Sequence, residues 1–411
     1  MSVQALQCKE CRETYPLDAR YVCEQCFGPL EVQYDLSGLD PAATRRQIQD
    51  GPRSIWRYAD FLPFAEPPQP GLPVGLTPLQ RAPRLARDLG LGEVFVKNDT
   101  ANPTHSFKDR VVAVALAKAQ ELGYDVVACA STGNLANAVA AHAAAAGLES
   151  YVFIPADLEE QKVLATGVYG THLVAVRGTY DDVNRLCTEL SADRDWAFVN
   201  VNVRPYYAEG SKTLAFEIAE QLGFALPDRV VAPVASGSLF TKIARGFQEW
   251  LDVGLVDGRL PAFNGAQAAG CSPVAQAYAA GQDFCKPVRP DTIAKSLAIG
   301  NPADGPYALD LARSSGGSVE SVTDDEIREG IALLAQTTGI FTETAGGVTT
   351  AVLKKLAERG EIAADERVVL VITGDGLKTL DAVRGSFEVD EIDPSVAAFD
   401  AGADEQPVGA L

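Results

Sequence analysis

The sequence has no run of uncharged apolar residues that approaches the roughly 18 needed to cross a bilayer. Its first residues, MSVQALQCKECRETYP, lack both the basic leader and the apolar segment that direct a chain to export. We therefore expect a cytoplasmic protein that has no contact with a membrane.

Basic residues are scarce, with 35 Lys and Arg against 55 Asp and Glu and a formal charge of −20. Because so acidic a surface repels nucleic acids and anionic lipids, we expect neither as a partner. An anionic substrate would need a pocket whose positive or N–H-rich character is local. Excess acidic residues are also expected of proteins in concentrated salt, where ions screen self-repulsion, so we hypothesise a halophile-like protein.

Half of the eight cysteines fall within the first 26 residues, as two C-x-x-C pairs formed by Cys8 with Cys11 and by Cys23 with Cys26. So short a segment cannot fold on its own core, and four thiolates satisfy a tetrahedral zinc site without an open position for catalysis. Redox-active pairs or disulfides are the alternatives, and we favour a structural zinc site. The other four cysteines are scattered, and we interpret them as packing residues.

The 411 residues contain 47% hydrophobic and 22% charged residues, which is typical of a folded protein large enough for two or three domains. From residue 76 onward, short apolar runs alternate with amphipathic segments, which predicts an α/β protein with parallel sheets. Strands are expected at Val94–Lys97, Val126–Ala130, Glu149–Ile154, His172–Val176, Arg229–Val234 and Arg367–Ile372. Helices are expected at Phe107–Leu122, Leu135–Ala146, Asp181–Leu190, Ser211–Leu222, Ser238–Leu251, Asp324–Thr337 and Gly346–Arg359.

We divide the chain into five parts. A zinc-ribbon-like module at 1–35 is followed by a connecting arm rich in Pro and Gly at 36–75. The rest is predicted to form a large α/β domain at 76–104 with 215–387, a smaller α/β domain at 105–214 and an acidic tail at 388–411.

Two motifs precede predicted helices in the smaller domain. In Ser106-Phe107-Lys108-Asp109-Arg110, Ser106 is a candidate N-cap with Asp109 three residues later. Lys108 then falls in the first turn, where the helix dipole disfavours an ammonium and favours the neutral amine that forms Schiff bases. The second motif, Ser131-Thr132-Gly133-Asn134, opens a helix whose N–H groups attract anions. A surface lysine and a plain helix cap are the alternatives for these two motifs.

Two further motifs follow predicted strands in the large domain. Ala235-Ser236-Gly237-Ser238 joins a strand to a helix, an arrangement that can hold a phosphate, although it lacks the spacing of a nucleotide-binding loop. Thr373-Gly374-Asp375-Gly376-Leu377-Lys378 follows the last predicted strand, where ligands bind in parallel sheets. Asp375 is either a catalytic carboxylate or, as we favour, a turn residue between two glycines.

Together these motifs resemble the β family, or fold type II, of pyridoxal-phosphate (PLP) enzymes, and within it the threonine synthases. The similarity spans about residues 75–385, and a zinc-ribbon-like start also occurs in some threonine synthases. Segments 292–294, 299–302 and 209–213 resemble threonine synthases in particular.

The resemblance implies a role for each matching residue. Lys108 would carry PLP as a Schiff base and act as the base, while Asn134 would bond the cofactor 3′ oxygen and Thr373 would meet the pyridine nitrogen. The residues implied to bind the cofactor phosphate are Ala235, Ser236, Gly237, Ser238 and Leu239, and those implied to face the substrate are Ser131 and Thr132. The implied reaction converts O-phospho-L-homoserine and water to L-threonine and phosphate, and we expect a homodimer.

The chain departs from the family pattern at three places. The phosphate loop has less Gly and Asn than usual, and His105 stands where Gly is frequent. Tyr207 occupies the position where several relatives have an arginine for the substrate phosphate, so we expect Arg204 or Lys212 to take that role. A cysteate synthase, a threonine dehydratase or another ammonia-lyase of the same fold, and a non-catalytic zinc-ribbon interaction protein are the alternative functions.

Overall fold

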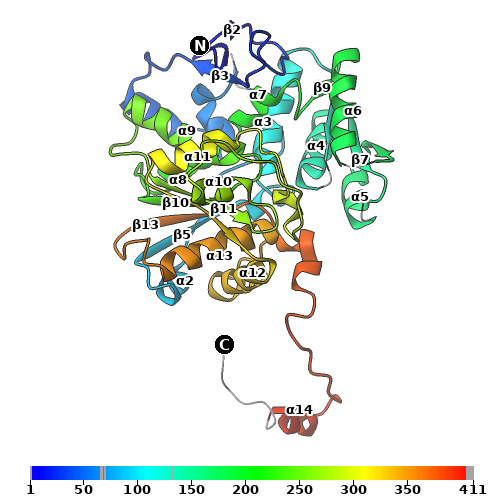
Figure 1. Cartoon of the computed structure of the whole chain (residues 1–411), viewed down its shortest axis with the longest axis vertical. Coiled ribbons are helices and arrows are strands. Elements are labelled where there is room, and N and C mark those ends of the chain that lie inside the picture. The colour runs from blue at the N-terminus through cyan, green and yellow to red at the C-terminus, as the bar shows by residue number, and fades with distance from the viewer. Residues whose placement is uncertain are drawn as a thin grey trace.

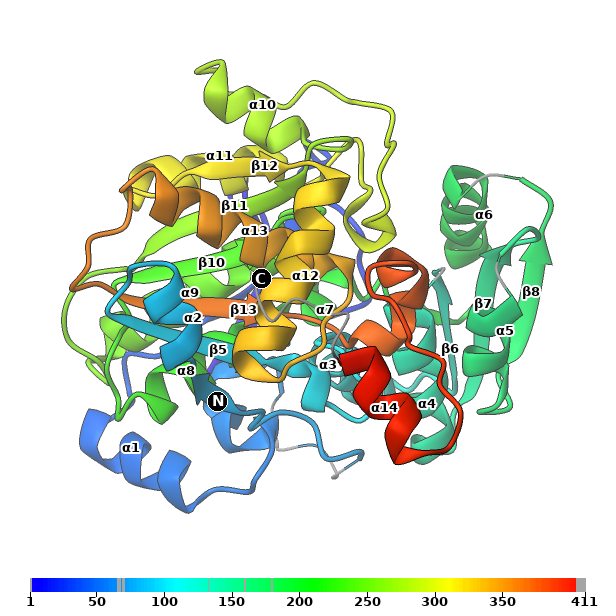
Figure 2. The same cartoon turned by 90° about the horizontal axis from the view of Figure 1, so that it is seen from below.

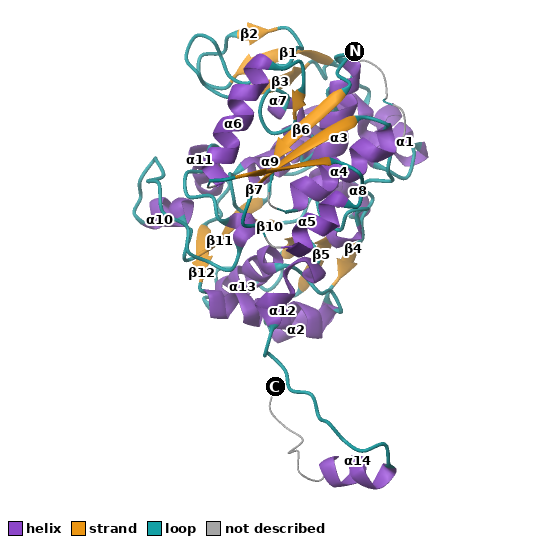
Figure 3. Cartoon of the chain, turned by 90° about the vertical axis from the view of Figure 1, so that its right-hand side faces the viewer, coloured by secondary structure: helices purple, strands orange, loops and turns teal. Residues whose placement is uncertain are grey.

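The computed structural model describes residues 2–64, 68, 71–131, 133–158, 160–178 and 180–403. Three separate sheets organise the chain, and helices surround the two larger ones (Figures 1 and 3). None of the helices in these described ranges is long and apolar enough to cross a membrane.

The N-terminal sheet has three antiparallel strands in the order β2-β1-β3. They are β1 (Val3–Cys8), β2 (Thr14–Tyr15) and β3 (Leu30–Tyr34). Apolar side chains of β1 and β3, including Leu6 and Val32, join one core with residues of the helices that flank the four-stranded sheet. The N-terminal sheet, at the top of Figure 1, is therefore packed against the rest of the protein.

The large sheet has six strands in the order β12-β11-β10-β13-β5-β4, all parallel except β4, which pairs antiparallel with β5. Its strands are β4 (Leu79–Arg81), β5 (Glu93–Asn98), β10 (Arg229–Pro233), β11 (Ala262–Ala268), β12 (Val319–Val322) and β13 (Arg367–Ile372).

Both faces of this sheet are covered by helices. Alternate residues of β13 point to opposite faces, so Val369 and Val371 join one buried core while Val368, Leu370 and Ile372 join the other. The first core is completed by α8 (Lys212–Gln221), α9 (Ser238–Val253), α10 (Pro273–Ala279) and α11 (Gly305–Ser314). The second is completed by α2 (Pro83–Asp88), α12 (Asp324–Thr338) and α13 (Thr344–Glu358).

The third sheet has four parallel strands in the order β8-β7-β6-β9 and lies beside the large sheet (Figure 2). Its strands are β6 (Val126–Ala130), β7 (Glu149–Pro155), β8 (His172–Val176) and β9 (Ala197–Phe198). Its helices are α3 (Lys108–Glu121), α4 (Asn134–Ala146), α5 (Glu160–Gly167) and α6 (Tyr180–Asp193).

The remaining elements connect these layers. They are α1 (Pro41–Asp50), α7 (Arg204–Glu209), α14 (Val396–Ala403) and the 3-10 helices η1 (Ile55–Phe61), η2 (Asp99–Ala101), η3 (Lys295–Leu297) and η4 (Gly376–Val383). In Figures 1 and 3, α14 stands apart from the body at the end of an extended segment.

The expected α/β fold with parallel sheets is confirmed, and all six expected strands and seven expected helices are present with small shifts at their ends. The segment we expected to be only a connecting arm is partly helical. Pro41 begins α1, and the Asp40 carboxylate accepts a hydrogen bond of 2.7 Å from the Ala43 N–H as its N-cap. The helix α14 lies in the predicted tail, whose residues 404–411 fall outside the described ranges.

A buried charge cluster ties α3 to the large sheet. The Arg110 guanidinium donates to both carboxylate oxygens of Asp99, at 2.7 and 2.8 Å, and to both of Glu217, at 2.5 and 2.8 Å. The Lys97 ammonium also contacts Glu217, at 2.6 Å, and all four side chains have zero exposure. Burial opposes ionisation of Glu217, but Arg110 and Lys97 outweigh it and lower the pKa of its carboxyl to about 2.

We expect Glu217→Gln to lower the free energy of unfolding by about 3–5 kcal/mol, because it leaves two buried cations with one fewer partner charge. Denaturant unfolding near neutral pH measures this loss. The depressed pKa means that the carboxylate stabilises the fold above the ordinary value of 4.5, and that this contribution is lost as the pH falls toward 2. The difference in the free energy of unfolding between Glu217→Gln and the wild type should become smaller as the pH falls through that range.

The exposed Glu329, which contacts Lys354 at 3.4 Å, provides the matched control. Glu329→Gln should change the free energy of unfolding by less than about 1 kcal/mol. A Glu217→Gln variant as stable as this control would refute the stabilising role of the buried cluster.

Candidate active site

Three of the predicted motifs meet at one edge of the large sheet. The strands β10, β13 and β5 are parallel neighbours, with Val231 opposite Leu370 and Ile372 opposite Asn98. Their carboxyl ends therefore lie at the same edge, where ligands bind in parallel sheets. The segments 235–239, 373–376 and 99–108 follow these three strand ends directly.

The lysine motif is bonded directly to the segment after β13. The Phe107 N–H donates to the Thr373 carbonyl at 2.9 Å, and the Asp375 N–H donates to the His105 carbonyl at 3.1 Å. His105 has φ 60°, the left-handed region that ordinary side chains rarely adopt. That conformation is consistent with the glycine often found at this position in the family.

Lys108 is the first residue of α3, as the sequence predicts. The predicted capping box is wrong, because Phe107 occupies the cap position and makes no side-chain cap bond. The Asp109 carboxylate instead accepts from the Thr104 N–H at 2.8 Å and from His142 Nε2 at 3.0 Å. Asp109 therefore fixes the loop before Lys108 to α4, the helix that begins at Asn134.

Asn134 lies between Glu343, which no sequence motif includes, and Lys378, the last residue of the motif that follows β13. Its amide nitrogen donates to the two carboxylate oxygens of Glu343 at 3.1 and 3.0 Å, and its amide oxygen accepts from Lys378 Nζ at 2.8 Å. Burial raises the pKa of Glu343 and lowers the pKa of Lys378, so both groups are shifted toward their neutral forms. Perturbed titratable groups of this kind gather at functional sites.

The residues expected to face the substrate are only partly placed. Ser131 is buried, and its hydroxyl oxygen accepts from the N–H groups of Gly133 and Ala136 at 3.3 and 3.1 Å. Thr132 lies outside the described residues. Arg204 is half-buried and pairs with Asp304 at 2.8 Å.

Lys212 does not join this site. Its ammonium is fully buried between Glu209 at 2.6 Å and Glu249 at 3.0 Å. The expectation that Lys212 could bind a substrate phosphate is therefore corrected, because two carboxylates already neutralise its charge inside the core.

The phosphate-loop candidate has the backbone geometry that its sequence requires. Gly237 has φ 97°, and a Cβ there would approach the Asp304 carbonyl oxygen to 2.6 Å, so no other residue fits. Asp304 also donates its N–H to the Ser236 carbonyl at 2.8 Å. Helix α9 begins at Ser238, so its first-turn N–H groups are directed toward this loop.

The site residues fit a bound pyridoxal phosphate. A lysine at a helix start, a helix N-terminus after a glycine turn, and a half-buried amide meet at this sheet edge and at the neighbouring start of α4. The hydroxyls of Ser106 and Thr344 are buried and have no hydrogen-bond partner within the described part of the chain. Unpaired buried polar groups of this kind are rare and are consistent with a ligand.

A tyrosine outside the predicted set contacts Lys108. Lys108 Nζ donates to the Tyr207 hydroxyl at 2.6 Å. The sequence marked Tyr207 only as a departure from the family pattern. Its position in the site depends on the path of the chain between β9 and α8, which periodicity alone does not predict.

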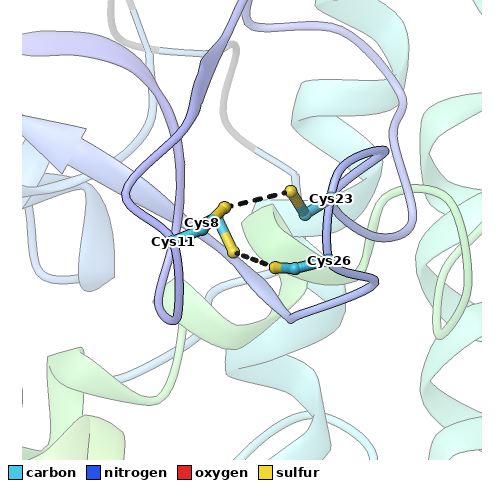
Figure 4. A group of neighbouring side chains, drawn as sticks. All are labelled: Cys8, Cys11, Cys23 and Cys26. Atoms are coloured by element: carbon cyan, nitrogen blue, oxygen red, sulfur yellow. Dashed lines mark hydrogen bonds between the residues drawn. The ribbon is translucent and has the colours of Figure 1, made fainter.

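The four N-terminal cysteines form a single cluster (Figure 4). Their Sγ atoms all lie within 4.8 Å of one another, close to the spacing of about 3.8 Å that four thiolates at about 2.3 Å from a tetrahedral zinc ion would have. Burial opposes ionisation of Cys23, but hydrogen bonds from Tyr15 and from backbone N–H groups lower its pKa to about 6. A Cβ at Gly28 would approach Cys8 Sγ to 2.9 Å, so this position requires glycine.

Comparison with known proteins shows which family the chain belongs to. Residues 71–374 match the family of pyridoxal-phosphate dependent enzymes. The threonine synthase of Methanocaldococcus jannaschii is 40% identical over 387 residues, which cover 93% of this chain and 95% of that protein. The threonine synthase of Methanosarcina acetivorans is 39% identical over 376 residues, with 91% and 92% covered.

Solved structures show the same fold at lower identity. Threonine deaminase isoform 2 from Solanum lycopersicum has a TM-score of 0.63 and 22% identity, with 75% of this chain and 87% of that chain covered. A fungal L-serine ammonia-lyase from Rhizomucor miehei has the same score and identity, with 76% and 99% covered.

The chain is therefore a member of the pyridoxal-phosphate-dependent enzymes of fold type II. Within them it belongs to the threonine synthase family, because the identity to several of these synthases is 36–40% over most of the chain.

Lys108→Ala should abolish the visible absorption band that a covalently attached pyridoxal phosphate gives, because the ε-amine is the attachment point. The absorption spectrum after purification with added cofactor measures this directly. Lys295→Ala, which changes a lysine outside the site, should keep the band. A Lys108→Ala protein that retains the wild-type band would exclude Lys108 as the attachment residue.

Proposed function

We propose that the protein is a threonine synthase that converts O-phospho-L-homoserine and water to L-threonine and phosphate, with pyridoxal phosphate as cofactor. The observation that carries the proposal is the placement of Lys108, Asn134 and the 373–376 segment around one sheet edge in a chain 40% identical to a threonine synthase. When bound, the cofactor supplies an electron sink for the bonds at the substrate α carbon.

The chain's own residues would hold the cofactor and move protons. Lys108 would hold the cofactor through Nζ, and the same nitrogen would take and return protons at the α and β carbons of the substrate. Asn134 would bond the 3′ oxygen of the ring, and the Thr373 hydroxyl would contact its nitrogen. The N–H groups of the loop Ala235–Leu239 would hold the phosphate.

Asn134 would have to exchange partners when the cofactor binds. Its amide nitrogen is engaged by Glu343 and its amide oxygen by Lys378. Because burial shifts Glu343 toward its neutral form, this carboxyl can act as a hydrogen-bond donor or a proton store beside the cofactor. We propose Glu343 and Lys378 as additional members of the site on this basis.

Arg204 is the proposed ligand for the substrate phosphate. Its guanidinium is half-exposed and pairs with Asp304, whose backbone contacts the Gly237 turn. It therefore lies next to the loop proposed for the cofactor phosphate. A bidentate guanidinium suits a phosphate dianion, and its release from Asp304 would make the charge available.

The activity is tested by incubating the purified protein with O-phospho-L-homoserine and measuring L-threonine and free phosphate. Equal amounts of both products are expected. A cofactor band without threonine would contradict the proposed reaction, and phosphoserine with sulfite, serine and threonine would then be the substrates to examine.

Arg204→Gln should raise KM for O-phospho-L-homoserine about 10- to 100-fold with a smaller change in kcat, because a charged contact to the substrate is lost. Asp304→Asn, which releases the arginine, should leave KM unchanged or lower it. Arg313→Gln, which removes a comparable ion pair with Asp283 elsewhere, serves as the control. An Arg204→Gln variant with the KM of the control would exclude Arg204 as the phosphate ligand.

We also propose a structural zinc ion at Cys8, Cys11, Cys23 and Cys26. Purified protein should contain about one zinc per chain by elemental analysis. Cys23→Ser should lower both the zinc content and the thermal midpoint, because one of four ligands is lost. Cys285→Ser should lower neither, since Cys285 is half-buried away from the cluster. A metal-free wild-type protein with an unchanged midpoint would refute the proposal.

A further inference from the structure

We propose that Tyr207 is a positioning residue for Lys108: its hydroxyl holds the free ε-amine in the orientation in which that amine forms its bond to the cofactor. The inference rests on the proposed attachment of pyridoxal phosphate to Lys108 and does not depend on which amino acid is the substrate.

The contact is short and specific. Lys108 Nζ donates to Tyr207 Oη at 2.6 Å. Within the described residues, this hydroxyl is the only hydrogen-bond acceptor of the Lys108 side chain. The ring of Phe107 also lies near the nitrogen, at 4.7 Å from its centroid. A flexible four-carbon side chain at a helix start is thus fixed at its tip by one neutral oxygen.

Tyr207 can fix the lysine because its own helix is held from several sides. A six-residue helix such as α7 is not stable on its own. Arg204 binds Asp304 on the large domain at 2.8 Å, and the Tyr206 hydroxyl donates to the Asp18 carbonyl of the N-terminal module at 2.9 Å. Glu209 binds Lys242 at 2.7 Å and accepts from the Tyr34 hydroxyl at 2.8 Å.

Helix α7 also lies unusually close to α3. A Cβ at Gly210, the residue after α7, would approach the Arg110 carbonyl oxygen to 2.5 Å and Val111 Cα to 2.6 Å. The two backbones are therefore in direct contact two residues beyond Lys108. This contact fixes the distance between the backbones that carry the lysine and the tyrosine, so the geometry of the pair does not depend on side-chain flexibility alone.

A phenol suits this place because it is uncharged and can accept a hydrogen bond. The neutral form of the amine, which is the form that bonds an aldehyde, can donate one N–H to Tyr207 while its lone pair points elsewhere. In the bond-forming step, the lone pair of Nζ attacks the aldehyde carbon of the cofactor, a C=N bond replaces the C=O bond, and the oxygen leaves as water. Holding the nucleophile in one orientation raises the rate of such a step without changing the affinity for the cofactor.

The test measures the rate at which the visible band returns when pyridoxal phosphate is added back to protein from which it has been removed. The plateau rate at saturating cofactor reports bond formation, and the half-saturating concentration reports binding. In Tyr207→Phe we expect the plateau rate to fall about 10-fold while the half-saturating concentration changes less than about two-fold. Tyr207→Gln, whose amide oxygen can accept the same bond, should recover part of the rate.

Tyr278→Phe is the matched control, since it removes a tyrosine hydroxyl that donates to the Gly317 carbonyl at 2.9 Å outside the site. It should keep the wild-type plateau rate. A Tyr207→Phe protein with the wild-type plateau rate would overturn the inference. A Tyr207→Phe protein in which only the half-saturating concentration changes would also overturn it. So would a slower plateau rate accompanied by a thermal midpoint lower than that of Tyr278→Phe, because the loss would then reflect a damaged fold.

The rate at which the visible band returns does not depend on which substrate the enzyme uses. A wild-type protein that regains the band but makes no threonine would contradict the proposed substrate, and the comparison of variants would still decide the role of Tyr207. A wild-type protein that never forms the band would overturn the cofactor assignment and this inference together.

Discussion

The guanidinium of Arg110 is the point on which the arrangement of the site depends. It lies two residues after Lys108 and satisfies both carboxylate oxygens of Asp99 at the end of β5 and both of Glu217 on α8. Because a buried guanidinium must keep its partners, the start of α3 cannot move without moving the large sheet and α8. The backbone of Lys108 is therefore held by the ion pairs of Arg110, and its side-chain nitrogen by the Tyr207 hydroxyl.

The fold was largely predictable from sequence because most of its strands and helices carry strong periodic signals. The buried strand β13 is a continuous run of Val, Leu and Ile, as expected where both faces of a parallel sheet are covered. The strand β11 was missed because its sequence, Ala-Phe-Asn-Gly-Ala-Gln-Ala, is small and polar. Its buried Asn264 and Gln267 are acceptable only because Arg229, Ser318 and neighbouring backbone groups satisfy them, which is a tertiary effect.

The site was predictable where a motif lies next to a strand end or a helix start. Lys108, Asn134 and Gly237 all have such a local signal. Glu343 and Tyr207 do not, because they contact Asn134 and Lys108 across 209 and 99 residues of chain. Lys378 ends the motif after β13, but its contact with Asn134 spans 244 residues and is not predictable from the motif. The prediction that Lys212 binds the substrate phosphate is wrong for a different reason. The sequence shows a lysine next to a motif, but the fold pairs its ammonium with Glu209 and Glu249.

The dependence of α7 on the N-terminal module has a consequence for how the chain is made. Asp18 and Tyr34 leave the ribosome first, yet their partners Tyr206 and Glu209 follow 188 and 175 residues later. Part of the core that the module joins, Val203 and Tyr206 around α7, is therefore synthesised only after the smaller sheet. The proposed zinc ion would keep that early segment folded in the interval. Contacts of such long sequence separation slow the final assembly.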